Sequence, residues 1–163
     1  MENERLLAVI DKYISEDMVS DFCELFEKIT EQLKARKADS IKIVRISFLR
    51  SSVLDDLPWF RVDFYNEHDY ADRRGIHFYW GCDELIRRIN AQKPIPDRLE
   101  LRSKVAKDEH EFKLLKMTAA ERCHELLLKS IMSAISICDK EYYVSQRIAV
   151  YYGEYVGPCE KIV

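Results

Sequence analysis

Three runs of alternating apolar and polar residues decide the fold: Ile41-Lys-Ile-Val-Arg-Ile-Ser-Phe-Leu-Arg50, Trp59-Phe-Arg-Val-Asp-Phe-Tyr65 and Ile76-His-Phe-Tyr-Trp80. Such alternation is typical of half-buried strands, because successive side chains point to opposite sides of a sheet. The connections, residues 51–58 and 66–75, are short enough for antiparallel hairpins. The sequence therefore predicts a β-meander over residues 41–80.

The even-numbered side chains of the three runs form the predicted core face. All of them are aliphatic or aromatic, as expected for strands that pack one face against helices. They are Val44, Ile46, Phe48, Phe60, Val62, Phe64, Ile76, Phe78 and Trp80.

The odd-numbered side chains form a second predicted face, which mixes charges with aromatic rings. Arginine supplies contacts to anions, and an aspartate beside a histidine can orient it for acid–base work. Pairs of charged and aromatic residues also occur across strands simply as stabilisers of the sheet. The candidate binding residues on this face are Arg45, Trp59, Arg61, Asp63, Tyr65, His77 and Tyr79.

The two hairpins predict which of these side chains lie opposite one another. If they close at residues 50–58 and 65–75, Arg45 lies opposite Asp63, and Asp63 lies opposite His77. We therefore expect a polar row across the three strands. A slip by one residue would bring apolar side chains to this face, so its composition is fixed more firmly than the pairing.

Helices are expected before and after the meander. Apolar residues recur at helical spacing over residues 4–14 and 18–33, with Ser15 as the N-cap of the second helix. Residues 82–90 predict a short helix. Thr118-Ala-Ala-Glu121 is a capping box, which predicts that a new helix starts at Ala119 and runs to about Cys138.

The remaining segments are a connection, a strand and a tail. Residues 97–105 fit a helix or a strand, residues 139–146 are expected to be a connection, and residues 147–152 predict a further strand. The whole pattern predicts an α+β fold in one domain, residues 1–163. Its antiparallel sheet has about four strands, the β-meander 41–80 and the C-terminal strand, and helices pack on one face.

Composition narrows the class of protein. Apolar residues make up 47% and charged residues 34%, and the formal net charge of −3 argues against nonspecific nucleic-acid binding. The charged N-terminus does not resemble a signal peptide, and the apolar segment Leu126–Cys138 is too short to span a membrane. The five scattered cysteines are expected to be reduced thiols, so we expect a cytoplasmic protein.

Other motifs give weaker signals for chemistry. The acidic loop 66–72 matches no metal-binding spacing, and the chain lacks a glycine-rich phosphate loop, so we expect neither a metal nor another cofactor. Cys123 and His124 are adjacent on a helix and point apart, which favours a half-buried helix boundary. Tyrosines near the C-terminus, among them Tyr151 and Tyr155, are expected in a strand or at an interface.

Two functional hypotheses follow from the mixed face. The first is a non-enzymatic protein-interaction module, which binds a protein partner or self-associates. The alternative is a small-molecule or anion binder, or a weak hydrolase, centred on Arg45, Arg61, Asp63 and His77. A pocket over His77 with Asp63 in hydrogen-bonding reach favours the alternative, whereas an open face with paired charges favours the module.

Overall fold

The computed structural model describes residues 2–35, 40–53, 55, 60–68, 75–91, 103–138, 140–155 and 157–163. The predictions for Trp59, for loop residues 69–72 and for residues 97–102 lie outside these ranges.

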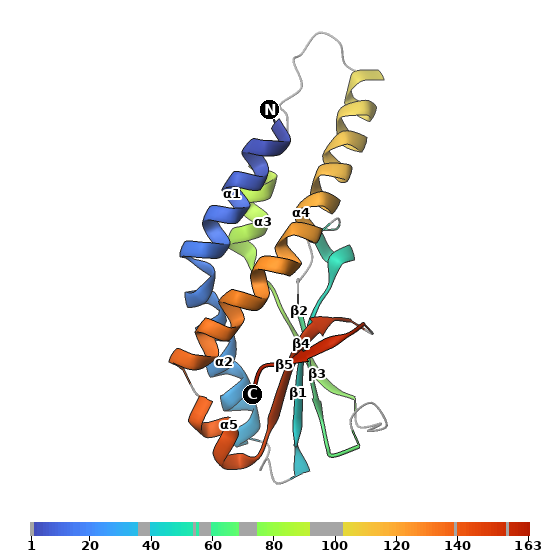
Figure 1. Ribbon diagram of the computed structural model, residues 1–163. Coiled ribbons are helices and arrows are strands. Elements are labelled where there is room, and N and C mark those ends of the chain that lie inside the picture. The colour runs from blue at the N-terminus through green and yellow to red at the C-terminus, as the bar shows by residue number, and fades with distance from the viewer. Residues whose placement is uncertain are drawn as a thin grey trace.

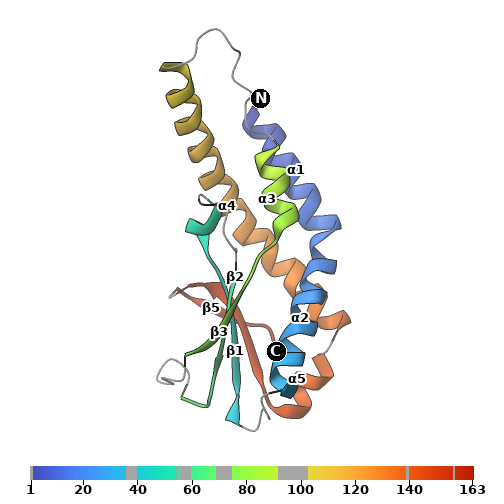
Figure 2. The same cartoon turned by 180° about the vertical axis from the view of Figure 1, so that it is seen from behind.

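The described elements alternate between helices and strands. In chain order they are α1 (Glu2–Glu16), α2 (Met18–Ala35), β1 (Ile43–Phe48), η2 (Arg50–Val53), β2 (Phe60–Tyr65), β3 (Ile76–Trp80), α3 (Asp83–Asn90), α4 (Ser103–Ile137), α5 (Lys140–Gln146), β4 (Ala149–Glu154) and β5 (Cys159–Lys161). The α-helices lie on one side of the sheet, and the first half of α4 extends beyond the sheet alongside α1 and α3 (Figures 1 and 2). The mixed α and β fold with helices on one face agrees with the prediction.

The sheet differs from the prediction in strand number and direction. It has five strands in the order β3-β2-β1-β4-β5, and β4 runs parallel to β1. The prediction of a wholly antiparallel sheet of about four strands is therefore wrong. After β3 the chain crosses the helical layer through α3, α4 and α5 before it enters β4. A long crossover of this kind can return a strand in the parallel direction, whereas a tight hairpin cannot.

The predicted register of the meander is confirmed. Arg45 pairs with Asp63 between β1 and β2, and Asp63 pairs with His77 between β2 and β3. The hairpin closures assumed from the sequence thus place the strands correctly, and both edges of the polar row are where they were expected.

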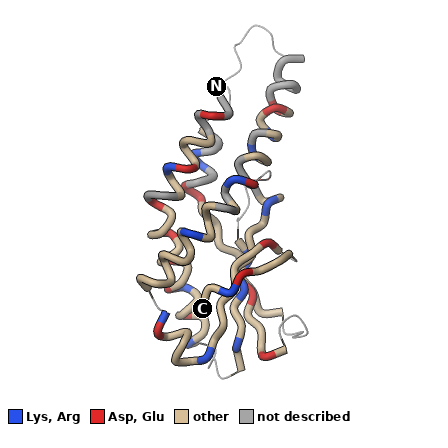
Figure 3. Tube along the Cα trace, viewed as in Figure 1, with Lys and Arg blue, Asp and Glu red and all other residues tan. Residues whose placement is uncertain are grey.

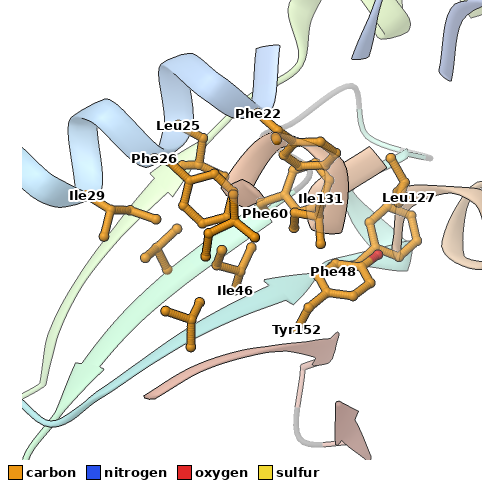
Figure 4. Close-up of a cluster of buried hydrophobic side chains, with 14 of the residues drawn as sticks. Phe22, Leu25, Phe26, Ile29, Ile46, Phe48, Phe60, Leu127, Ile131 and Tyr152 are labelled. Atoms are coloured by element: carbon orange, nitrogen blue, oxygen red, sulfur yellow. The ribbon is translucent and has the colours of Figure 1, made fainter. Parts of the chain in front are cut away.

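The core lies between the sheet and the helices. The inward side chains of β1 and β2 are buried, and those of β3 are half-buried at the edge of the sheet. Figure 4 shows Phe22, Phe26 and Ile29 of α2 above Ile46 and Phe60 of the sheet. Complete burial of such side chains contributes roughly 1.5–3 kcal/mol each, so this layer fixes which sheet face stays open.

Two predicted helix starts are wrong. Ser15 lies inside α1, which continues to Glu16, and α2 begins at Met18 after the turn residue Asp17. Thr118 lies inside α4, and its hydroxyl donates to the carbonyl of Leu114 over 3.2 Å. That bond is the backward one that threonine makes within a helix, so it caps no new helix.

The long helix α4 and the short helix α5 replace the predicted break and connection. The expected connection 139–146 is largely α5, whose Tyr143 is completely buried and shares a hydrogen bond with Thr30 of α2 over 3.2 Å. α4 continues for 35 residues. None of the helices in the described ranges combines the length and the apolar character needed to cross a membrane.

Candidate functional site

The open side of the sheet carries the predicted mixed face. We call it the outer face and define it as the outward side chains of the five described strands together with Tyr155, which follows β4. Its members are Ile43, Arg45, Ser47, Arg61, Asp63, Tyr65, His77, Tyr79, Ala149, Tyr151, Gly153, Tyr155, Cys159 and Lys161. The alternate side chains of β1 and β2 are buried under the helices and those of β3 are half-buried, so the predicted parity of the meander is correct.

A polar row crosses all five strands on this face. From β3 to β5 the paired residues are His77, Asp63, Arg45, Tyr151 and Lys161. The sequence predicted the first three members. The last two join the row because β4 lies beside β1 and β5 lies beside β4.

Arg61 and Asp63 form the central ion pair of the outer face. The Nε atom of Arg61 donates to both carboxylate oxygens of Asp63, over 2.9 and 3.0 Å, and Nη2 donates over 2.7 Å. The hydrogen bonds and the charge of Asp63 raise the pKa of Arg61. The carboxylate is therefore neutralised within its own strand.

Tyr155 and Tyr79 flank this ion pair. Nη1 of Arg61 donates to the hydroxyl of Tyr155 over 3.0 Å, and the guanidinium carbon lies 4.9 Å from the ring centre of Tyr155 and 6.0 Å from that of Tyr79. Asp63 and Ser47 are only 3% and 2% exposed although they belong to the outer face. The ring of Tyr79 is 49% exposed and that of Tyr155 is 46% exposed, so a partner would first meet aromatic surface.

Arg45 makes a second contact between a cation and an aromatic ring. Its guanidinium carbon lies 5.1 Å from the ring centre of Tyr151, its neighbour on β4. An arginine over a tyrosine ring is attracted electrostatically by the face of that ring. Charge and aromatic surface are therefore combined twice on the outer face.

His77 and Asp63 are neighbours in the register but do not form an acid–base pair. The Nδ1 atom of His77 lies 2.9 Å from the carbonyl oxygen of Gly75, and its ring contacts Tyr79 edge to face. The hydrogen bonds of Asp63 go to Arg61. Asp63 therefore does not orient His77 for acid–base chemistry.

The structure brings together six of the seven predicted site residues, since Trp59 lies outside the described ranges. Tyr65 lies one row from Asp63, at the end of β2. Sequence reasoning did not place Tyr151, Tyr155 or Lys161 at this site. Tyr155 is 94 residues from Arg61 in the chain, and its aromatic C-terminal neighbourhood was the only signal available.

The charge of the outer face is opposite in sign to that of the chain. Among its described members, Arg45, Arg61 and Lys161 are cations and Asp63 is the one carboxylate, which leaves two net positive charges with histidine neutral. The whole chain has a formal net charge of −3. On the helices, acidic and basic positions are interspersed (Figure 3).

The described residues offer no metal centre. No group of three or more His, Cys, Asp or Glu side chains that could hold a metal ion occurs in the ranges that the structure covers. In the loop after β2, the backbone N–H of His68 donates to the side chain of Asn66 over 2.7 Å. This contact forms the start of an ordinary polar turn.

Comparisons of the chain with protein-family models, with curated proteins and with solved structures give no match. The function is therefore inferred from the site.

Proposed function

We propose that the protein is a non-enzymatic interaction module whose outer face binds an acidic segment of a partner protein. The observation that supports this proposal most strongly is the excess of two positive charges among exposed tyrosine rings, on a chain whose net charge is −3. Tyrosine and arginine are enriched in protein interfaces, and complementary charge steers partners together.

The internal hydrogen bonds of the face support binding rather than catalysis. Asp63 is neutralised by Arg61, and His77 faces the Gly75 carbonyl. A general base needs a free acceptor near its substrate, and a surface held rigid by its own contacts suits recognition instead. The alternative small-molecule or hydrolase function is therefore the weaker proposal.

Charge also argues for an acidic partner and against a second copy of the chain. In a symmetric dimer each patch contacts its own duplicate, so Arg45 and Lys161 would face the same excess of positive charge. An acidic segment would instead gain attraction from both cations. The negative charge on the rest of the chain disfavours long polyanions such as nucleic acids.

The proposal is tested by selecting displayed random peptides on the immobilised full chain. We expect enrichment of peptides rich in Asp and Glu. Purified peptides should bind the double variant Arg45→Gln/Lys161→Gln about tenfold more weakly or worse, and added salt should reduce wild-type binding.

A matched control removes the same charge elsewhere. Lys113 and Lys140 are exposed on helices α4 and α5, so Lys113→Gln/Lys140→Gln changes the net charge equally without touching the outer face. Peptides that bind both double variants equally well would overturn the proposal, as would a selection that enriches no acidic sequence.

A further inference from the structure

A pocket of about 280 Å³ lies between α4 and the β4–β5 hairpin. It is separate from the ion pair of the outer face. His124 and Leu128 of α4 form one side, and Tyr152, Gly153, Cys159 and Glu160 form the other. Gly153 and Cys159 of the outer face also line this pocket, but the charged and tyrosine side chains on which the proposed function rests do not.

Stacked aromatic rings border the inner side of the pocket. The imidazole of His124 lies nearly parallel to the rings of Phe48 and Tyr152, at interplanar angles of 17° and 28° and centre distances of 6.1 and 5.8 Å. Tyr152 and Leu128 add apolar surface. Such a wall suits a planar or compact hydrocarbon group.

Gly153 allows the hairpin to close the other side. A Cβ atom at this position would lie 2.3 Å from the carbonyl oxygen of Pro158 and 2.7 Å from the Cα of Cys159. Because these are backbone contacts, they cannot be relieved by a side-chain rotation. The absence of a side chain thus lets β5 pack tightly and brings Cys159 and Glu160 to the pocket.

The polar groups of the pocket favour a hydrogen-bond donor with positive charge. The Nδ1 atom of His124 is buried and has no hydrogen-bond partner among the described residues. Its Nε2 atom lies 3.8 Å from the carboxylate of Glu154, which also pairs with Arg50. Glu160 is exposed and adds a further carboxylate. Because the buried Nδ1 atom is out of reach of a ligand, Glu160 supplies the accessible charge of the pocket.

We propose that this pocket binds a small amine carrying a single ring or short hydrocarbon group. The hydrocarbon lies against Tyr152, Leu128 and the imidazole, and the ammonium group pairs with Glu160. The size fits this class, since a cavity of about 150 Å³ already holds benzene. The positive charge of the amine matches the Glu160 carboxylate, and the described residues around the pocket supply no ligand set for a metal.

The test is an NMR titration of the isotope-labelled full chain with 2-phenylethylamine, and separately with 2-phenylethanol, its neutral counterpart. We expect amide signals of residues 152–154 and 159–160 to shift with both compounds, and the amine to bind more tightly. Glu160→Gln should weaken the amine about fivefold and leave the alcohol unchanged, since exposed ion pairs contribute little more than this.

Two further variants define the site. Leu128→Trp should fill the pocket and block both compounds, whereas Glu141→Gln on α5 removes an exposed carboxylate outside the pocket and should change neither. If Leu128→Trp does not fold, Glu160→Gln still decides, because its side chain is exposed. Equal binding of amine and alcohol, no binding of either, or insensitivity of the amine to Glu160→Gln would overturn the proposal.

Discussion

The guanidinium of Arg61 holds the carboxylate of Asp63, two residues away on the same strand, through both Nε and Nη2. Asp63 is thereby neutralised without a cross-strand partner, and His77 turns to the Gly75 carbonyl. This contact keeps the Asp63 carboxylate from His77, and the described residues of the outer face retain two net positive charges. It also explains how a carboxylate that is 3% exposed is tolerated on the open side of the sheet.

Loss of Arg61 should destabilise the fold. Arg61→Met leaves Asp63 charged and nearly buried, and we expect the free energy of unfolding to fall by about 2–3 kcal/mol, below the range for completely buried pairs because Arg61 is partly exposed. Asp63→Leu in the same chain should recover most of the loss. Urea unfolding followed by circular dichroism measures both variants, and a loss under about 0.5 kcal/mol for Arg61→Met would contradict this role.

Tyr13 should make stability depend on alkaline pH. Its hydroxyl donates to Asp21 and lies 3.1 Å from Cys82, and burial, together with these groups, raises its pKa. A tyrosine in the unfolded chain ionises at about pH 10. Tyr13 in the folded protein stays protonated at that pH. Its contribution to stability is complete below that pH and declines as the pH rises above it.

The comparison of Tyr13→Phe with wild type between pH 8 and 11 isolates this effect. At the lower pH the variant should be less stable by about 1–2 kcal/mol, because a buried hydroxyl contact is lost. The difference should shrink above about pH 10. Tyr151→Phe, which keeps the ring beside Arg45, serves as the control. A constant difference across the range would argue against the protonated hydroxyl.

Thr118→Ala should not weaken the long helix. Thr118 is exposed within α4 and bonds backward to Leu114, and alanine has the higher helix propensity. We expect the free energy of unfolding, measured with heat or urea, to stay unchanged or to rise by up to about 0.5 kcal/mol. A true N-cap threonine would instead lose about 1 kcal/mol on this replacement, and that result would support a helix start at Ala119.

Arg147→Gly should stabilise the end of α5. Arg147 has a φ of 55°, a left-handed conformation that glycine adopts freely. The N–H of Ile148 donates to the carbonyl of Tyr143 over 2.9 Å, and that of Arg147 to the carbonyl of Val144 over 3.1 Å, as in a Schellman motif. We expect Arg147→Gly to raise the free energy of unfolding in urea by about 0.5–1 kcal/mol. Arg147→Ala should not raise it.

The meander could be predicted from the sequence because its information is local. Alternation fixed which side chains of β1, β2 and β3 face the helices, and hairpin closure fixed the pairing of Arg45 with Asp63. The direction of β4 is not encoded in this way, since side chains alternate equally in parallel and antiparallel strands. It depends on the path of α4 and α5 across the sheet.

The side-chain contacts of the site were harder to predict from the sequence than its composition. Arg61 and Asp63 are next-but-one neighbours on one face, so the local ion pair competes with the cross-strand row that the register suggests. Side-chain geometry decides whether Asp63 pairs with Arg61 or with its cross-strand neighbours. Tyr155 reaches Arg61 only because β4 pairs with β1, a contact between distant parts of the chain that no short motif could indicate. His124 meets Cys159 at the pocket for the same reason.

The most direct test of the outer face as a binding surface is NMR mapping of a selected acidic peptide on the labelled full chain. We predict that the largest shifts fall on Arg61 Nε–H and on the amides of Arg45, His77, Tyr79 and Lys161, and that α1 and α2 remain unchanged. Shifts confined to the helices, or to the pocket beside His124, would contradict the assignment of the outer face.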